Sequence, residues 1–164
     1  MTVKKILTEP NKALRQISEV VEKVNDEERK LMDDMLETMY AAPGIGLAAI
    51  QVGIPKRVIV MDISKKEGEK VPMHFINPEV IDKSNSNSSY EEGCLSVPGQ
   101  FAEIERPAKC KIKFLDYNGN PQEIETEGML ATCIQHEIDH LEGVLFIDYL
   151  SKLKKSMIVK KLSK

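Results

Sequence analysis

Residues 133–143 read Cys133-Ile134-Gln135-His136-Glu137-Ile138-Asp139-His140-Leu141-Glu142-Gly143. Two of the chain's three histidines, His136 and His140, stand four positions apart in this stretch. On an α-helix these side chains lie about 40° apart around the axis and one turn apart along it, so both imidazoles can reach one metal ion. Glu137 lies on the same side, where it could accept a proton from a water molecule at the ion without itself being a ligand.

The flanking residues favour an amphipathic helix. Thr126 or Glu127 suits its N-terminal end, and Gly143 suits the position just after its last turn. Its apolar surface comprises Met129, Leu130, Cys133, Ile134, Ile138 and Leu141. A core helix whose histidines only find hydrogen-bond partners is the alternative. Because both histidines, the intervening glutamate and the helical context coincide, we favour a metal site, which still requires a third protein ligand.

Composition indicates one soluble globular domain spanning residues 1–164. Charged residues make up 30% and apolar residues 41%, and the net charge of -3 gives no general reason to expect nucleic acid as the substrate. No apolar run approaches the roughly 20 residues of a membrane span, so we expect no membrane association. The three cysteines form no paired framework, which suits a reducing compartment, and we expect a cytoplasmic location.

Hydrophobic spacing predicts a helix that begins after Asn25 and ends at Ala42-Pro43-Gly44. Asn25 and Glu28 have the spacing of a capping box. The apolar stripe of this helix is rich in methionine, which is far more often core packing than a cofactor site.

Strand patterns follow at residues 57–63, 72–81, 103–115 and 122–125. The polar segment between Asp82 and Ser89 is predicted to be an exposed loop. In the third strand pattern apolar residues alternate with lysines, which places Cys110 in the core. His74 has no ligand spacing to the other histidines, so we interpret it as an ordinary structural histidine.

Two further segments carry candidate functional residues. The segment Gly44 to Gln51 is small and glycine-rich, which allows close backbone approach, but it lacks the third glycine of a dinucleotide-binding loop. It is either a tight buried connection or a site to which Gln51 donates a hydrogen bond. Cys94 lies in the segment Glu91 to Pro98, on an extended segment or turn where its sulfur could point into a cleft. A lone cysteine is, however, usually a small buried residue.

Three blocks together resemble the three motifs of the peptide deformylase family: Gly44 to Gln51, Glu92-Gly93-Cys94-Leu95-Ser96, and Gln135-His136-Glu137-Ile138-Asp139-His140-Leu141. Their order and separations match the family, and the chain around them looks similar over nearly its whole length. The resemblance implies an α+β fold in which antiparallel β-sheets surround a central metal-ligand helix, with an N-terminal helix and a C-terminal helix as in the shorter bacterial form.

Residue by residue, the resemblance implies that Cys94, His136 and His140 are the metal ligands. One thiolate and two neutral imidazoles leave a divalent ion with a net charge of about +1, enough to lower the pKa of bound water. Family members characteristically use ferrous iron, Fe2+, while Zn2+, Ni2+ or Co2+ can occupy the same ligands. Cys133 is a poorer third ligand, because seven helical positions place its Cα about 10 Å along the axis from that of His140.

The resemblance also implies a reaction, the hydrolysis of the formyl group on the N-terminal methionine of a newly synthesised polypeptide, with release of formate. The partners implied are N-formylmethionyl nascent peptides. The side-chain amide of Gln51 and the backbone N–H of Leu95 would stabilise the oxyanion, and Glu137 would pass a proton to the leaving amine. Matching positions suggest the substrate-binding pocket, formed by Gly44, Ile45, Gly46, Glu92, Met129 and Cys133.

Two other classes of protein share parts of this pattern. A zinc endopeptidase also uses His-Glu-x-x-His, but its third ligand usually lies downstream of the helix, and no histidine follows His140 here. A non-catalytic metal-binding or ribosome-associated module would need neither Glu137 nor Gln51.

The C-terminal end is rich in lysine and has no acidic residue from Ser151 onward. It resembles the family's C-terminal helix, which gives the hypothesis that it docks on ribosomal RNA or protein near the exit of the nascent chain. A solvated helix face is the alternative, because lysine runs are common and attraction to phosphate is independent of sequence.

Overall fold

The computed structural model describes residues 2–64 and 68–163. Its helices and strands, in chain order, are α1 Asp26–Ala41, β1 Gly46–Ala48, β2 Val58–Met61, β3 Met73–Lys83, β4 Asn87–Cys94, β5 Val97–Pro107, β6 Lys109–Leu115, β7 Pro121–Glu127, α2 Gly128–Leu141 and α3 Lys152–Leu162. Three short 3-10 helices accompany them: η1 Lys12–Arg15, η2 Ala49–Val52 and η3 Phe146–Tyr149.

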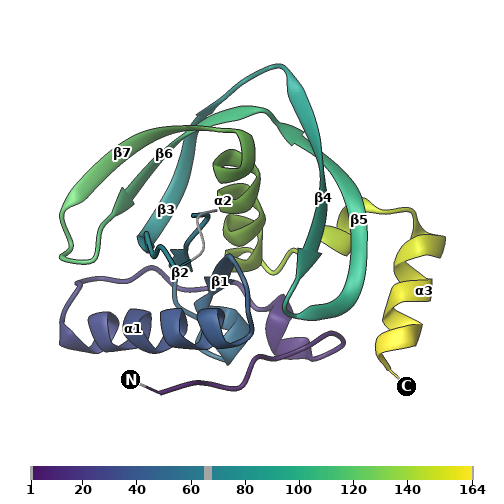
Figure 1. Cartoon of the computed structure of the whole chain (residues 1–164), viewed down its shortest axis with the longest axis horizontal. Helices are drawn as coiled ribbons and strands as arrows, with labels where there is room; N and C mark the ends of the chain where they lie inside the picture. The colour runs from purple at the N-terminus through teal and green to yellow at the C-terminus, as the bar shows by residue number, and fades with distance from the viewer. Residues whose placement is uncertain (1, 65–67, 164) are drawn as a thin grey trace.

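Two antiparallel sheets flank the helix α2 (Figure 1). The larger has the strand order β1-β2-β3-β6-β7, and the smaller is the hairpin β4-β5. Helix α2 stands between them in Figure 1, with α1 below and α3 at the outer side of the hairpin. The predicted α+β class, with antiparallel sheets around a central helix and a helix toward each end of the chain, is confirmed.

Strand β2 explains how two helices pack on one sheet. Its four residues are all apolar and all buried. Val58 and Val60 join a core cluster with the methionines of α1, whereas Ile59 and Met61 join a second cluster with residues of α2. Successive side chains of a strand point to opposite faces, so a strand that is covered on both faces reads as a continuous apolar run.

Helices α1 and α2 begin and end where the sequence predicts. The Asn25 side chain accepts the N–H of Glu27 at 3.0 Å, and the Glu28 carboxylate accepts the N–H of Asn25 at 3.3 Å, so the capping box forms. Helix α2 is followed by Gly143, whose φ of +75° favours glycine. A side chain there would also collide with the carbonyl of Arg15, so the helix stop is fixed by packing as well.

Two strand predictions were wrong in their boundaries. The segment Asp82 to Ser89 is not one exposed loop, because β3 continues to Lys83 and β4 begins at Asn87. The predicted strand 103–115 is two strands in different sheets, which separate at Pro107 and Ala108. Proline has no N–H to continue the ladder, and Ala108 instead donates its N–H to the Ser86 carbonyl at 2.9 Å.

The predicted C-terminal helix is present as α3, capped by the Ser151 hydroxyl, which accepts the N–H of Lys154 at 3.2 Å. None of its residues is fully buried. Partly buried apolar side chains join it to the core beneath the hairpin, namely Ile158, Val159 and Leu162. Among the residues that the structure describes, no helix has the length and apolar character needed to cross a membrane.

Candidate active site

Cys94, His136 and His140 lie together although they come from two separate elements. Cys94 is the last residue of β4, and the histidines are one turn apart on α2. Their ligand atoms all lie within 4.8 Å of one another, and Cys94 Sγ is 3.3 Å from His140 Nε2. Both histidines are buried, and Cys94 is half-buried. The side chains that the resemblance implies as ligands therefore converge on one point.

This donor set fits a divalent cation. A tetrahedral ion with one sulfur and one nitrogen ligand would hold those two atoms about 3.6 Å apart, close to the separation of Cys94 Sγ and His140 Nε2. Burial lowers the pKa of His140 well below its usual value, which keeps its imidazole neutral, as a metal ligand must be. The cluster and its donors support a divalent metal. The same three side chains suit iron, zinc, nickel and cobalt, so they do not select one of these metals.

Glu92 fixes the orientation of His136. The two residues interact through Glu92 Oε1 and His136 Nδ1, 2.9 Å apart. A carboxylate can only accept this bond, so the neutral His136 ring carries its proton on Nδ1, and in that form Nε2 is free for an ion. Burial alone would raise the pKa of Glu92, but hydrogen bonds from His136 and Arg106 outweigh it and hold that pKa below its usual value. Glu92 thus lines the cavity, as predicted, and also supports a candidate ligand.

Arg106 is the residue of this site that the sequence analysis missed. Its buried guanidinium donates to both carboxylate oxygens of Glu92, at 2.7 and 3.0 Å. One sequence signal could have found it. Arg106 lies two positions after the buried Ile104 on β5, and residues at this spacing share one face of a strand.

Glu137 is buried beside the ligand cluster, and its Oε1 has no hydrogen-bond partner among the described residues. Burial raises its pKa to about 7. A carboxyl group with a pKa near neutrality can both take up and release a proton at neutral pH. Gly46 on β1 makes room for it, since a Cβ at that position would lie 2.6 Å from Glu137 Oε2. Gly46, in the segment predicted to allow close approach of the backbone, therefore packs against Glu137, the predicted proton carrier.

The amide of Gln51 is held in a single orientation. Its Oε1 accepts the N–H of Ala48 at 2.9 Å, which identifies the other atom as nitrogen. Gln51 Nε2 donates to Ser96 Oγ at 3.0 Å and lies 3.6 Å from Cys94 Sγ. Leu95, the other predicted oxyanion donor, lies in the turn that follows Cys94. Both residues adjoin the ligand cluster, and of the two only Leu95 lines the neighbouring cavity.

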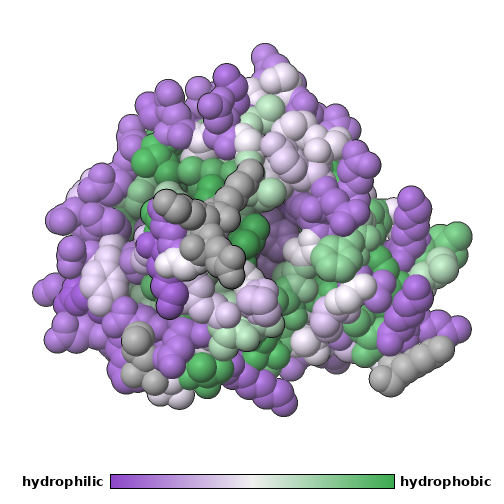
Figure 2. Space-filling model, in the orientation of Figure 1, coloured by the Kyte–Doolittle hydropathy of each residue, from purple (hydrophilic) through white to green (hydrophobic). Residues whose placement is uncertain are grey.

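A cavity of about 720 Å³ opens beside the cluster. Figure 2 shows the surface hollowed near the centre of this face, next to the β4-β5 hairpin. Its walls come from the segment before β1, the hairpin and one side of α2. They include every residue predicted for substrate binding, namely Gly44, Ile45, Gly46, Glu92, Met129 and Cys133. His136 and Glu137 line it as well, so the cavity reaches the candidate metal centre.

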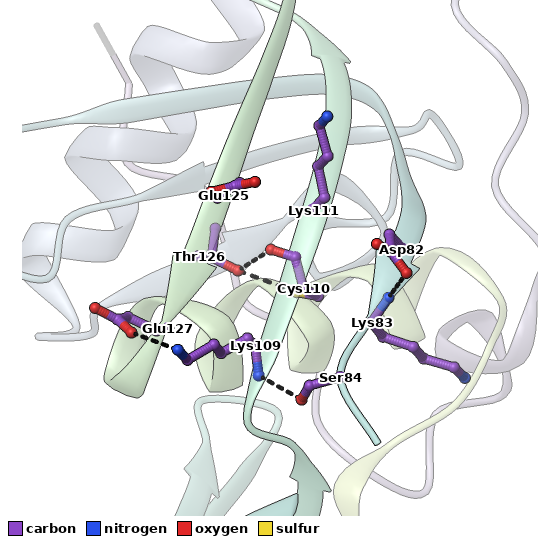
Figure 3. Close-up of a pocket in the computed structure, with 9 residues that line it drawn as sticks. All are labelled: Asp82, Lys83, Ser84, Lys109, Cys110, Lys111, Glu125, Thr126 and Glu127. Carbon is purple, nitrogen blue, oxygen red and sulfur yellow. Dashed lines mark hydrogen bonds and ion pairs between the residues drawn. The ribbon is translucent and has the colours of Figure 1, made fainter. Parts of the chain in front are cut away.

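A second hollow, of about 450 Å³, lies where β3, β6 and β7 meet (Figure 3). Its charged side chains balance one another, with Lys109 Nζ 3.6 Å from Glu127 Oε2. Cys110 is buried beneath it and lies 3.0 Å from the Thr126 hydroxyl, as expected for a core cysteine. None of the predicted site residues lines this hollow. His74 also lies apart from the ligand cluster, with its ring 4.9 Å from that of Tyr117.

Comparison with known proteins agrees with this geometry. Residues 3–156 match the family described as polypeptide deformylase. The peptide deformylase of Pelagibacter ubique is 72% identical over 164 residues, which is 100% of this chain and 95% of that protein. The peptide deformylase of Phenylobacterium zucineum is 59% identical over 164 residues, 100% of this chain and 97% of that protein.

Solved structures give the same result. The crystal structure of peptide deformylase from Ehrlichia chaffeensis in complex with actinonin has a TM-score of 0.95 and 48% identity, covering 99% of this chain and 97% of that chain. A peptide deformylase from Legionella pneumophila has a TM-score of 0.92 and 44% identity, covering 99% of this chain and 94% of that one. With the family matched over nearly all of its length, this chain belongs to the peptide deformylases.

Proposed function

We propose that this protein is a metal-dependent hydrolase that removes the formyl group from the N-terminal methionine of newly synthesised polypeptides and releases formate. One observation carries the proposal: the cluster of Cys94, His136 and His140 lies beside the buried Glu137 at a cavity large enough for a side chain. Such peptides are made at ribosomes, so we place the protein in the cytoplasm.

The three clustered side chains would hold one divalent ion. We favour ferrous iron from the family resemblance, and zinc, nickel or cobalt would suit the same donors. When bound, the ion would polarise the formyl carbonyl and lower the pKa of water at its open position. Glu92 would keep the His136 ring oriented toward the ion through its 2.9 Å hydrogen bond.

Glu137 is the proton carrier in this proposal. Its unpartnered Oε1 can accept a proton from the attacking water and then deliver it to the methionine nitrogen as the C–N bond breaks. Burial supports this role because it brings the pKa of Glu137 to about 7. The products are then formate and a free amino group at the start of the peptide.

Gln51 and Leu95 would stabilise the negative charge that develops on the formyl oxygen. The Gln51 amide is fixed by its hydrogen bond from Ala48, and its Nε2 donates to Ser96 Oγ at 3.0 Å and lies 3.6 Å from Cys94 Sγ, at the edge of the ligand cluster. The backbone N–H of Leu95 lies immediately after the ligand Cys94. One donor from each of the first two motifs would thus act on the same oxygen.

The methionine side chain would enter the cavity beside the cluster. Met129 and Cys133 on α2 line it together with Gly44, Ile45 and Gly46. These apolar walls suit an unbranched thioether, and the polar groups at the inner end fix its orientation. We therefore assign them to substrate binding, together with Glu92, which contributes a wall while it holds His136.

A zinc endopeptidase is the less favoured alternative. Its third ligand usually lies downstream of His-Glu-x-x-His, whereas Cys94 comes from a strand that precedes the helix by more than thirty residues in the sequence. The relatives described above carry the name peptide deformylase.

We also propose that α3 docks on the ribosome near the exit of the nascent chain. Leu153 and Met157 are 72% and 53% exposed on this lysine-rich helix. Apolar side chains among lysines suit a surface that combines phosphate with protein. A solvated face remains the competing interpretation, and co-sedimentation decides between them.

Formate release tests the main proposal. Metal-replete protein is incubated with a formyl-methionyl peptide, and formate and the new amine are both quantified. The same peptide carrying an acetyl group in place of formyl is the matched control, and mass spectrometry detects any internal cleavage. Equimolar formate and amine, with internal bonds intact, is the expected result. Internal cleavage without formate would instead identify an endopeptidase.

A further inference from the structure

The guanidinium of Arg106 joins two elements behind the candidate metal centre. Its side chain is only 5% exposed. It donates from Nε and Nη2 to the two carboxylate oxygens of Glu92 on β4, and from Nη1 to Asp139 Oδ2 on α2 at 2.8 Å. This single planar group therefore fixes the distance and angle between the strand that carries Cys94 and the helix that carries the histidines.

Glu92 transmits the position of Arg106 to a candidate ligand. The same oxygen, Glu92 Oε1, meets Arg106 Nη2 at 3.0 Å and His136 Nδ1 at 2.9 Å. A shift of the guanidinium therefore moves the carboxylate that holds the His136 ring. Arg106 lines no part of the cavity, so it acts on the site only through Glu92 and Asp139.

Tyr149 contacts Asp139 and Arg106 on the side away from Glu92. It lies in η3, just before α3, and its hydroxyl donates to Asp139 Oδ2 at 2.7 Å. The guanidinium carbon of Arg106 also lies 4.9 Å from the centre of the Tyr149 ring, where a cation is attracted by the aromatic face. Tyr149 is 52% exposed and lies outside the cavity. It thus contacts both Asp139 and Arg106 from the protein surface.

We propose that Tyr149, Asp139 and Arg106 form a positioning relay that runs from the C-terminal segment to His136 through Glu92 and sets how tightly the site retains its metal. The inference rests on the proposed metal site. None of the three residues lines the cavity, so their role is to hold a ligand in place. Partners of this kind orient the ring and tune metal affinity.

The test is metal retention by Tyr149→Phe, which removes only the hydroxyl. Protein loaded with cobalt is mixed with excess chelator, and loss of the cobalt-thiolate absorption is followed in time. Losing one hydrogen bond corresponds to about 3- to 10-fold faster metal release. Tyr117→Phe is the matched control, because the Tyr117 hydroxyl donates to Asp33 at 3.2 Å, away from the cavity and the ligand cluster. It should release cobalt at the wild-type rate.

A double substitution separates a relay from general loosening. Arg106→Lys keeps the charge but loses the two-pronged contact with Glu92, and we expect about 10- to 100-fold faster release. If Tyr149 acts through Arg106, then adding Tyr149→Phe to Arg106→Lys has less effect than the same change in the wild type. The KM of Tyr149→Phe for the formylated peptide should change less than the metal release rate, since Tyr149 itself lies outside the cavity.

Three outcomes overturn the inference. Equal release rates for Tyr149→Phe and Tyr117→Phe would show that the surface end of the relay does not affect the metal. Independent, multiplicative effects in the double variant would show that Tyr149 does not act through Arg106. If wild-type protein took up no cobalt, the proposed metal site itself would be wrong, a failure distinct from unchanged retention in a metal-loaded variant.

Discussion

Replacing Gly46 by alanine tests the placement of Glu137 without removing a functional group. A Cβ at this position would lie 2.6 Å from Glu137 Oε2, whereas ordinary contact begins near 3.4 Å. Gly46 is not among the residues with positive φ, so alanine strains no backbone. The closest overlap falls on the end of a side chain, so the carboxylate retreats by about 0.8 Å and the stability cost is about 1 kcal/mol, the low end for overpacking.

The same displacement of the Glu137 carboxylate should slow the reaction strongly. Moving a reacting group by roughly 1 Å costs about 10²-fold in rate, so kcat for formate release should fall about 10²-fold in Gly46→Ala. The metal content should change little, and KM should rise by less than kcat falls, because the new methyl group would also lie 3.1 Å from Cys133 Sγ in the cavity wall. Formate release is measured over a range of peptide concentrations, with metal content and the unfolding temperature determined on the same preparation.

Gly44→Ala is the comparison for this experiment. Its Cβ would lie 2.6 Å from Leu95 Cδ1, an equal overlap in the same cavity that does not involve Glu137. We expect it to raise KM more than it lowers kcat. If metal-replete Gly46→Ala kept its kcat within about threefold of the wild type, the assignment of Glu137 as a closely packed proton carrier would be refuted.

Three other predictions follow from the site and from α3. Glu137→Ala should keep its metal but lose at least about 10²-fold in activity, and near-normal formate release would contradict its role. Cys94→Ser should lose or weaken metal binding, while Cys133→Ser keeps the metal and perturbs mainly KM; metal content of the two purified variants distinguishes them, and the reverse pattern would overturn the ligand set. Removing residues 151–164 should weaken co-sedimentation with ribosomes and spare hydrolysis of a short peptide, whereas unchanged co-sedimentation at low salt would count against docking.

Local sequence patterns were sufficient for helices α1 and α2. The capping box of Asn25 and Glu28 and the stop at Gly143 are interactions between near neighbours or single-residue conformations. Strand boundaries were predicted less well. The alternation of side chains continues through Pro107, so the sequence shows one strand where the chain leaves the hairpin and enters the larger sheet.

The histidine pair and Cys94 differ in how far the sequence alone could identify them. His136 and His140 share one helix, so their spacing fixes their relative geometry. Cys94 reaches them from another element, and without the family resemblance it is a lone cysteine in a turn-rich segment. The same reasoning explains why Arg106 was missed, because its partners Glu92 and Asp139 come from β4 and α2 and no local spacing relates all three.

Glu92 links the proposed substrate cavity to the candidate metal centre, which affects how variants of the cavity should be interpreted. Glu92 forms part of the cavity wall, and its carboxylate is hydrogen-bonded to both His136 and Arg106. A substitution at Glu92 would therefore change substrate fit and metal retention together, and a loss of activity there could not be assigned to either cause. Cys133 lines the same cavity without a hydrogen bond to either candidate histidine among the described residues. Cavity shape is consequently better probed at Cys133, and ligand support at Tyr149, which lies outside the cavity.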